Sequence, residues 1–328
     1  MNLMSGYSSV GALLGENGAG EEDEPDWVSL HREGLLGLAV DHAIRNQREV
    51  PDKLRHTFMQ AVAFEMRCGS VLSEISQAAS GIQTLTFKGC ALAFGLYPRA
   101  GQRAFGDIDV AVPTRDWPGM VEVLKSLGFA QSVECLFNRD GLVVDLHRHP
   151  LHQLADLVGP RALEWWEGLQ PLSARTGTAV RLAHEHEFVL ALFHGSKHSF
   201  SRAGWVVDLA LLAQHVDSDR LARAVHRYRA HRQLAYASEC LDRWFGLLMP
   251  QALSRLASRR WNPVERRFVQ LVLQRKAPDF LGMLTPVASA PHPWAALVYL
   301  LKTLYPPGTP FLQRSQQLLS MMQTIWKS

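Results

Sequence analysis

Cysteine is scarce in this sequence, and no two cysteines stand at metal-ligand or redox spacing. The four cysteines are Cys68, Cys90, Cys135 and Cys240, and none of them forms a C-x-x-C pair. Zinc ribbons, thioredoxin-like redox centres and disulfide-stapled secreted domains all depend on such pairs. The sequence therefore argues against these classes and predicts four reduced thiols in a cytoplasmic protein.

Long apolar runs and a strong net charge are also lacking. No stretch reaches the roughly 18 apolar residues that a membrane-spanning helix needs, and the N-terminus lacks the basic and apolar regions of a secretory signal. The 34 basic and 31 acidic residues leave a net charge of only +3. We therefore expect neither a membrane nor a nucleic acid as a partner.

The composition is that of an ordinary globular protein. Of the 328 residues, 47% are hydrophobic and 20% are charged, which is enough for one large domain or two moderate ones. Residues 1–25 are rich in glycine and serine and end in an acidic run, so we expect a flexible leader there. Apolar residues at helical spacing then predict an N-terminal helical segment over 26–80.

Residues 81–150 carry strand-like patterns and are expected to form the core of the site. Helix-period apolar residues dominate beyond residue 150, with one short extra strand expected within 170–183. The fold class is therefore predicted as α+β: a small mixed sheet with helices over 81–150, flanked by the N-terminal helices and by a mainly helical domain over 151–328. The elements expected in the core are a strand (81–89), a helix (90–97), a basic loop (99–106), a strand (107–112), a helix (114–129) and a hairpin (131–149).

Two aspartates interrupt the second of these strands, in the run FGDIDVAV. Alternate side chains of a strand share a face, so Asp107 and Asp109 should point the same way, about 7 Å apart, while Ile108 and Val110 face the core. A close pair of carboxylates is costly unless something compensates for its charge. Mg²⁺ takes a few carboxylates together with substrate phosphate oxygens as ligands. The pair therefore predicts a site for a divalent cation.

A third carboxylate lies in the run GLVVDLHRH. Asp145 and His147 share one strand face by the same period of two. If their strand lies beside that of Asp109, three carboxylates converge on one site. The alternative is that Asp145 ends a strand or pairs with an arginine.

A resemblance to a known family lies in the run FKGCALAFGLYPRAGQRAFGDIDVAV, followed by VVDLHRH. It resembles the nucleotidyltransferase superfamily that shares the DNA polymerase β palm, and in particular a bacterial branch of uncharacterised nucleotidyltransferases. The shared features are a Lys-Gly pair after the first strand, a Tyr-Pro pair, an arginine shortly before Gly-Asp-x-Asp, and a Val-Asp-Leu-His motif. The later run LALFHGSKHSFSRAGWVVDLALL is similar to the helical portion of the same branch.

The resemblance covers about residues 26–320 and is most specific over 87–147. The chain departs from the wider superfamily in the first turn, where Lys88-Gly89-Cys90 replaces the usual Gly-Ser, and from the branch at Arg148, where tryptophan is common.

The resemblance implies a Mg²⁺-dependent nucleotidyltransferase. It would move a nucleoside monophosphate from a nucleoside triphosphate to a small-molecule or peptide acceptor. The expected group is AMP, with ATP as its donor. Branch members often occur beside genes for natural product biosynthesis, which suggests that class of acceptor. Two Mg²⁺ ions, or Mn²⁺ in their place, would be held by the catalytic carboxylates Asp107, Asp109 and Asp145. The nucleotide-binding residues would be Lys88, Gly89, Arg103, His147 and Lys197.

Several alternatives stay open on sequence alone. Arg103 is either a phosphate ligand or a solvated loop arginine, and His147 either orients a carboxylate or is a packed core histidine. His194 and His198 are one helical turn apart, which is zinc-ligand spacing. Their alternative roles are closure of the substrate cleft and helix packing. The run HEHE (184–187) is expected to be a solvated helix start. The alternative functions are a noncatalytic nucleotide-binding or interaction protein on the same fold, and a transferase acting on RNA ends.

Overall fold

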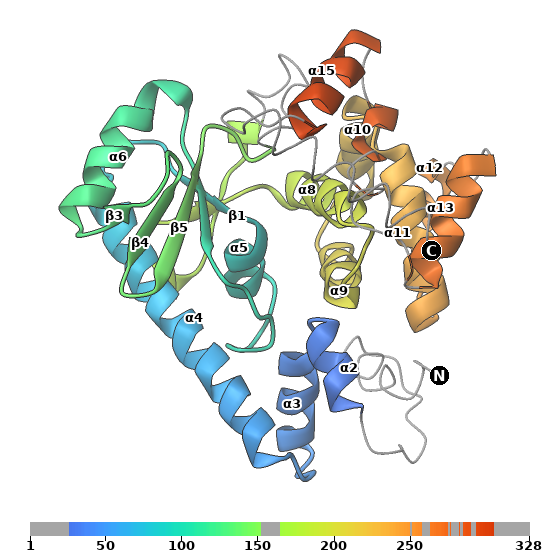
Figure 1. The fold of residues 1–328 in the computed structure, drawn as a ribbon, viewed down its shortest axis with the longest axis horizontal. Coiled ribbons are helices and arrows are strands. Elements are labelled where there is room, and N and C mark those ends of the chain that lie inside the picture. The colour runs from blue at the N-terminus through green and yellow to red at the C-terminus, as the bar shows by residue number, and fades with distance from the viewer. Residues whose placement is uncertain are drawn as a thin grey trace.

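The computed structural model describes residues 26–151, 165–249, 251–257, 263–274, 276, 282, 285–289 and 293–304. The leader expected over 1–25 lies outside these residues. Figure 1 shows a sheet at one side of the molecule and most of the later helices at the other. A mixed sheet surrounded by many helices confirms the predicted α+β class. In the part of the chain described here, no helix is both long enough and apolar enough to cross a bilayer.

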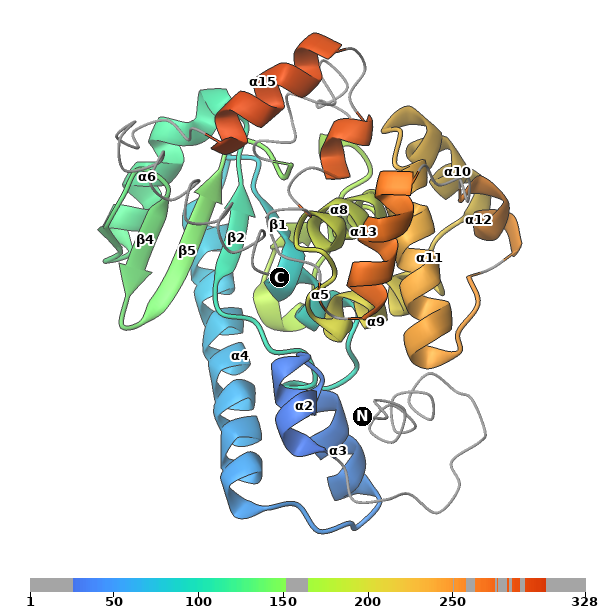
Figure 2. The same cartoon turned by 45° about the vertical axis from the view of Figure 1, so that its right-hand side comes forward.

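Within the described residues, three helices precede the sheet: α2 (Trp27–Arg32), α3 (Leu36–Arg45) and α4 (Asp52–Ala78). The sequence pattern runs through α2 and α3 without a break, but the structure separates them at Gly34, whose φ is 73°. Glycine adopts this left-handed conformation at little cost, whereas other residues do not. Pro51 stands immediately before α4, where its fixed φ suits the helix start. The long α4 runs along the sheet, and α2 and α3 lie at its far end (Figure 2).

In the described part of the chain, the sheet has seven strands in the order β3-β4-β5-β2-β1-β7-β6. β2 and β5 are parallel neighbours near its centre, and β1 runs antiparallel to β2. Two short strands from the later part of the chain complete one edge, where the sequence predicted only one. The strands are β1 (Leu85–Phe87), β2 (Ile108–Ala111), β3 (Ala130–Gln131), β4 (Leu136–Arg139), β5 (Leu142–His147), β6 (Gln170–Pro171) and β7 (Val180–Arg181).

Short connections with left-handed residues shape this part of the chain. α5 (Lys88–Gly95) joins β1 to the loop before β2, and α6 (Trp117–Ser126) follows β2 after the 3₁₀ turn η2 (Thr114–Asp116). The predicted hairpin is present as β4 and β5. Its central residues, Asp140 and Gly141, have φ values of 53° and 78°, as the two-residue turn between twisted antiparallel strands requires.

The two faces of the sheet have different partners. Ile108 and Val110 of β2 are buried in an apolar cluster with α4 and α6, as the sequence predicted. Leu85 and Phe87 of β1, with Ala111 of β2, belong to a second cluster that extends into the later helices. The alternation of strand side chains therefore sends Asp109 toward the later helices. The polar residues of β2 thus lie at the boundary between sheet and helices.

The later helices form one packed body around α8 and α11. α8 packs against α9, α10 and α11, and also reaches α5 beside the sheet. In both views α8 lies between the sheet and the helices α11 and α12, whereas α15 lies at the top of the molecule (Figures 1 and 2). These elements are η5 (Ala174–Thr176), α8 (His184–Lys197), α9 (Ala203–Leu212), α10 (Ser218–Arg227), α11 (His231–Phe245), α12 (Gln251–Leu256), α13 (Pro263–Leu273), η6 (Thr285–Ser289) and α15 (Pro293–Leu304).

Candidate active site

Two neighbouring strands bring two carboxylates and an imidazole together. In the parallel pair β2 and β5, Asp109 lies opposite Asp145, and Ala111 lies opposite His147. His147 Nε2 is 3.0 Å from Asp109 Oδ1 and 3.0 Å from Asp145 Oδ2. The strand of Asp145 therefore does lie beside that of Asp109. His147 is buried and contacts both carboxylates, so it is placed to orient them.

Asp107 stands just before β2 rather than inside it. The strand begins at Ile108, so strand alternation does not determine where Asp107 points. Its side chain lines the same cleft as Asp109. Among the described residues, however, the compact set of possible metal ligands, whose atoms all lie within 4.8 Å of one another, consists of Asp109, Asp145 and His147. The metal role predicted for Asp107 stays a prediction.

Lys88 supplies a counter-charge for the carboxylates. Its Nζ is 2.5 Å from Asp109 Oδ1 and lies 5.0 Å from the centre of the Phe87 ring. The backbone of Lys88 has a φ of 56°, a conformation that costs a non-glycine residue about 1–3 kcal/mol. This strained residue joins β1 to α5, where its side chain reaches the carboxylate cluster.

The clustered charges shift one another's pKa. Burial, followed by the charge of Asp109, raises the pKa of Asp107. Burial alone would raise the pKa of Asp145, but the hydrogen bond and charge of His147 outweigh it, so the pKa is lowered. Burial lowers the pKa of His147, yet its hydrogen bonds to Asp109 and Asp145 outweigh burial and raise it. The arrangement favours an ionised Asp145 beside a protonated His147.

The ligand atoms fit a divalent cation. Asp145 Oδ1 is buried and has no hydrogen-bond partner within the described part of the chain. An unsatisfied buried acceptor is costly unless something binds it. Asp109 is only 3% exposed, and its Oδ1 is already contacted by two cationic groups. Carboxylate oxygens suit Mg²⁺ and Mn²⁺, whereas the His147 imidazole would serve as a ligand to a transition metal only after losing its proton. This cluster can therefore hold a divalent metal ion.

A cleft of about 890 Å³, counted out to the open solvent, lies between this face of the sheet and the later helices. Positions 187 and 194 of α8 are seven residues apart, so both side chains lie on one face of that helix. The sheet side of the cleft is lined by Lys88, Gly89, Asp107 and Asp109, and the helical side by Glu187, His194, Trp205 and Asp208. The cleft is thus charged on both of its walls.

A buried ion pair crosses the cleft at Arg103. Its Nε donates to Asp208 Oδ1 at 2.9 Å, and its Nη2 donates to Asp208 Oδ2 at 2.8 Å. The hydroxyl of Tyr97 donates to Asp208 Oδ1 at 2.7 Å. The Arg103 side chain is only 12% exposed, so it is not a solvated loop arginine. Asp208 therefore sets the orientation of the guanidinium that the sequence proposed as a phosphate ligand.

Gly89 allows this arginine to approach the start of α5. A Cβ added at Gly89 would lie 2.9 Å from Arg103 Nη1 and 2.9 Å from Phe105 Cβ. A side chain would therefore push the loop before β2 away from α5. Because Lys88 and Gly89 line the cleft, the beginning of α5 is part of its wall. Backbone N–H groups at a helix start attract anions, and here two cationic side chains flank them.

Of the two histidines at the end of α8, His194 and His198, the first is a lining residue of the cleft. His194 lines the cleft, and its ring centre lies 5.1 Å from that of Trp205 and 4.9 Å from that of His198. In the region that the structure describes, neither histidine belongs to a set of three metal ligands. Lys197 is partly buried, and burial together with the charge of Lys88 lowers its pKa. The predicted nucleotide ligand Lys197 is therefore an electrostatic neighbour of the site.

The burial of Glu187 differs from the solvated helix start that the sequence predicted. α8 does begin at His184, but Glu187 is only 2% exposed, so the predicted solvated start is wrong at this position. Its Oε2 is 3.2 Å from Arg181 Nη1, and its Oε1 has no partner among the described residues. Burial raises the pKa of Glu187 to about 7, against the opposing charge of Arg181. Glu187 shares a helix face with Leu190 and His194, and this spacing was the feature of the sequence that could have indicated its burial.

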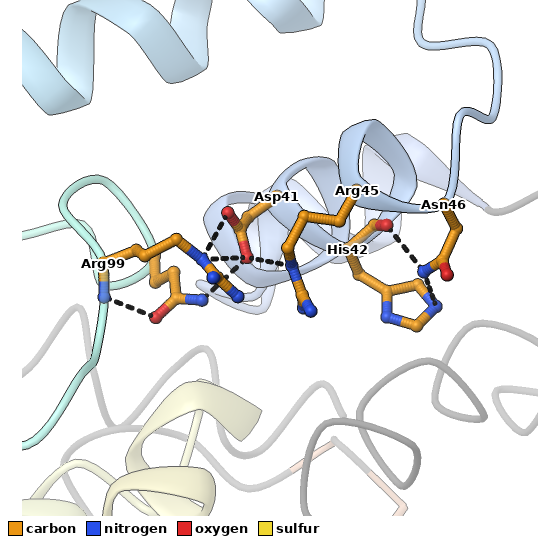
Figure 3. A network of polar contacts seen from close by, with 6 residues as sticks. Asp41, His42, Arg45, Asn46 and Arg99 are labelled. Carbon is orange, nitrogen blue, oxygen red and sulfur yellow. Dashed lines mark hydrogen bonds and ion pairs between the residues drawn. The ribbon is translucent and has the colours of Figure 1, made fainter.

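Buried carboxylates also hold the loop before β2 from its other side. Asp41 of α3 accepts hydrogen bonds from Arg99 Nε at 3.1 Å and from Gln102 Nε2 at 2.8 Å. Figure 3 shows the Asp41 carboxylate directed at Arg99. Glu65 of α4 accepts a hydrogen bond from the backbone N–H of Gly101 at 2.9 Å. Together with the arginine pair to α9, these contacts tie the loop to three separate helices.

Comparison with known protein families gives a match over most of the described chain. The family described as "Uncharacterised nucleotidyltransferase" matches residues 27–246. The matched region contains both walls of the cleft, from α5 to α9. No curated protein and no solved structure matches the chain.

Proposed function

The chain belongs to the uncharacterised nucleotidyltransferase family, and from this premise we propose that it moves a nucleoside monophosphate from a nucleoside triphosphate to a small-molecule or peptide acceptor. AMP from ATP is the proposed group, and Mg²⁺ is the proposed cofactor. The observation that carries the proposal is the placement of Asp109 and Asp145 on adjacent parallel strands beside the cleft.

Asp107, Asp109 and Asp145 are the proposed ligands of two Mg²⁺ ions. Bound Mg²⁺ supplies charge stabilisation to the phosphate oxygens and to the attacking and leaving oxygens. His147 orients the two strand carboxylates through its contacts with Asp109 and Asp145. The unpartnered Oδ1 of Asp145 supports this assignment, because a ligand there removes the cost of an unsatisfied buried acceptor.

The triphosphate is proposed to lie along the start of α5. Lys88 and Arg103 line the cleft there as cations, and Gly89 leaves room for a close approach to the backbone. The Nε and Nη2 atoms of Arg103 are engaged by Asp208, so Nη1 is the nitrogen proposed to contact phosphate. Lys197 adds a further positive charge, and its pKa is lowered by burial and by the charge of Lys88. These groups match the negative charge of a triphosphate.

The transfer step needs a base for the acceptor. An acceptor oxygen or nitrogen attacks the α-phosphorus, the bond from that phosphorus to the bridging oxygen breaks, and pyrophosphate leaves. The acceptor's proton passes to the Asp145 carboxylate, whose two oxygens together offer about four lone-pair sites, so that one site accepts the proton while another holds the metal. His147 holds the second oxygen of Asp145 at 3.0 Å, which keeps the carboxylate oriented during the transfer.

Calorimetric titration of the full chain with ATP, with and without Mg²⁺, tests the proposal. We expect wild type to bind ATP only with Mg²⁺, and Asp109→Asn combined with Asp145→Asn to weaken binding at least about tenfold, because two carboxylate ligands lose their charge. Asp242→Asn, at an exposed position of α11, is the matched control and should bind like wild type.

Catalysis is then followed as pyrophosphate release from ATP in the presence of pooled small-molecule and peptide acceptors. Magnesium-dependent binding that is never accompanied by pyrophosphate release would indicate a noncatalytic nucleotide-binding protein. A wild-type chain that binds no nucleoside triphosphate with Mg²⁺ or Mn²⁺ would contradict the transferase proposal.

A further inference from the structure

The helical wall of the cleft carries an aromatic pair that the phosphate chemistry does not use. Trp205 of α9 and His194 of α8 both line the cleft. Their ring centres are 5.1 Å apart and their planes meet at 79°, so the edge of one ring rests on the face of the other. The indole is partly buried, which leaves part of it open to the cleft. A fixed indole of this kind offers a flat surface for another flat ring.

The ring nitrogens of His194 are available to a ligand. Within the described residues, His194 makes no side-chain hydrogen bond, although it is a half-buried residue of the cleft wall. Burial, with the nearby His198 and the charges of Lys88, Arg103 and Lys197, holds its pKa well below the usual range. A neutral imidazole has one donor and one acceptor, which is the pattern found on the edges of nucleobases.

The surroundings of the pair suit a flat ligand with a polar edge. Leu190 and Ala191 add apolar surface to the same wall. The Arg202 guanidinium lies 5.9 Å from the centre of the Trp205 ring and so supports the ring as a cation–π partner. Stacking on an aromatic side chain beside an arginine is a recurring way to hold bases without strict sequence preference.

The position of the pair also fits the rest of the nucleotide. The phosphate side of the cleft is marked by Lys88, whose charge acts on both His194 and Lys197. The pair therefore lies close to the proposed triphosphate, on the opposite wall of the same cleft. A nucleotide with its phosphates at α5 can place its base against α8 and α9.

We propose that Trp205 and His194 form the nucleobase subsite of this cleft, with the base stacked on the indole and one edge hydrogen-bonded to the imidazole. This inference rests on the proposed nucleotidyltransferase function and assigns the part of the substrate that the helical wall binds. The competing occupant of the same wall is the acceptor.

Comparing two probes separates the base from the phosphates. Calorimetry of the full chain with Mg²⁺ would use ATP and inorganic tripolyphosphate, which has the phosphates but no base. We expect Trp205→Leu to weaken ATP binding by between about 5-fold and 150-fold, the range of one base–aromatic contact, and to leave tripolyphosphate binding unchanged. Trp205→Phe should retain most of the ATP affinity, because it keeps a ring. Trp294→Leu, at an exposed tryptophan of α15, is the matched control.

A second measurement does not depend on the leucine variant folding. ATP should quench tryptophan fluorescence in wild type and in Trp294→Phe, and most of that quenching should be lost in Trp205→Phe, whereas tripolyphosphate should quench none of them. Equal losses for both probes, unchanged ATP binding in Trp205→Leu, or quenching that survives in Trp205→Phe would overturn the base assignment and leave the transferase proposal standing. A wild-type chain that binds neither probe with Mg²⁺ would overturn both.

Discussion

The carboxylates around the cleft differ in what neutralises their charge. Asp109 is contacted by Lys88 and His147, and Asp208 by the bidentate Arg103. Glu187 is buried and only partly compensated, since only one of its oxygens meets a cation and the other has no partner among the described residues. A buried carboxyl in this condition is expected to retain its proton to unusually high pH.

The protonation of Glu187 makes stability depend on pH. Burial raises its pKa from 4.5 to about 7; the charges of Arg181 and Arg103 oppose the rise, and that of Asp208 adds to it. The folded protein therefore holds this proton more tightly than the unfolded chain, so the stabilising contribution is present below about pH 4.5 and lost as pH rises through about 7. Glu187→Gln cannot ionise. The melting temperature of wild type minus that of the variant should therefore fall between about pH 5 and pH 8.

Thermal unfolding of both proteins across this pH range is the measurement. Glu122→Gln, at an exposed position of α6, is the control and should show a difference that does not change with pH. A wild-type minus Glu187→Gln difference that is equally flat would show that Glu187 ionises normally.

At the scale of the elements, the loop before β2 packs closely against its neighbours. It is tied to α3 by Asp41 and to α4 by Glu65. It also passes so close to α3 that a Cβ added at Gly37 would lie 2.0 Å from the backbone oxygen of Gly101 and 2.8 Å from that of Gln102. Backbone atoms cannot move aside to relieve such a contact as easily as the end of a flexible side chain can. The position of the loop therefore depends on the absence of a side chain in α3.

Gly37→Ala is expected to displace the loop. The added methyl group should destabilise the protein by about 1–3 kcal/mol, as overpacking of a filled site does, and should also weaken Mg²⁺-dependent ATP binding because the loop carries the cleft arginine. Urea unfolding and calorimetry would measure both effects. In Gly119→Ala, the corresponding control in α6, the new Cβ meets the flexible end of Ile82 at 3.2 Å, so little change is expected. A Gly37→Ala protein as stable as this control would contradict the packing argument.

For the whole molecule, the cleft is assembled from segments that are far apart in the chain. Its sheet wall comes from α5, the loop before β2 and β2 itself, while its helical wall comes from α8 and α9. The pair of Arg103 with Asp208 joins the two walls over a separation of 105 residues and is nearly inaccessible to solvent. This pair therefore couples the stability of the fold to the shape of the cleft.

Asp208→Asn should test that coupling. Removing one partner of a buried ion pair leaves the other charge uncompensated and typically costs about 3–5 kcal/mol, so a large loss of unfolding free energy is expected. ATP binding should weaken as well, because Arg103 loses its fixed orientation. Glu134→Gln breaks the exposed pair with Arg148 and, as a control, should cost no more than about 1 kcal/mol. Equal effects of the two substitutions in urea unfolding would argue against the coupling.

The sequence alone determined the local features of this protein. Strand periodicity predicted that Ile108 and Val110 face the core and that Asp145 and His147 share a face, and turn residues predicted the hairpin at Asp140. The motifs around these residues also indicated the family that the comparison shows over residues 27–246. Such features depend on neighbours within a few positions of the chain, so they can be read directly from it.

The tertiary structure decided how these pieces meet. It alone showed that His147 bridges two carboxylates, that Arg103 is buried against Asp208, and that Glu187 is buried rather than solvated. It also showed that Asp107, which precedes β2, lies outside the compact ligand set of the described residues. Each of these facts depends on the packing of segments that are tens of residues apart in the chain. A local sequence pattern does not indicate which residue will be the ion-pair partner of a buried charged side chain.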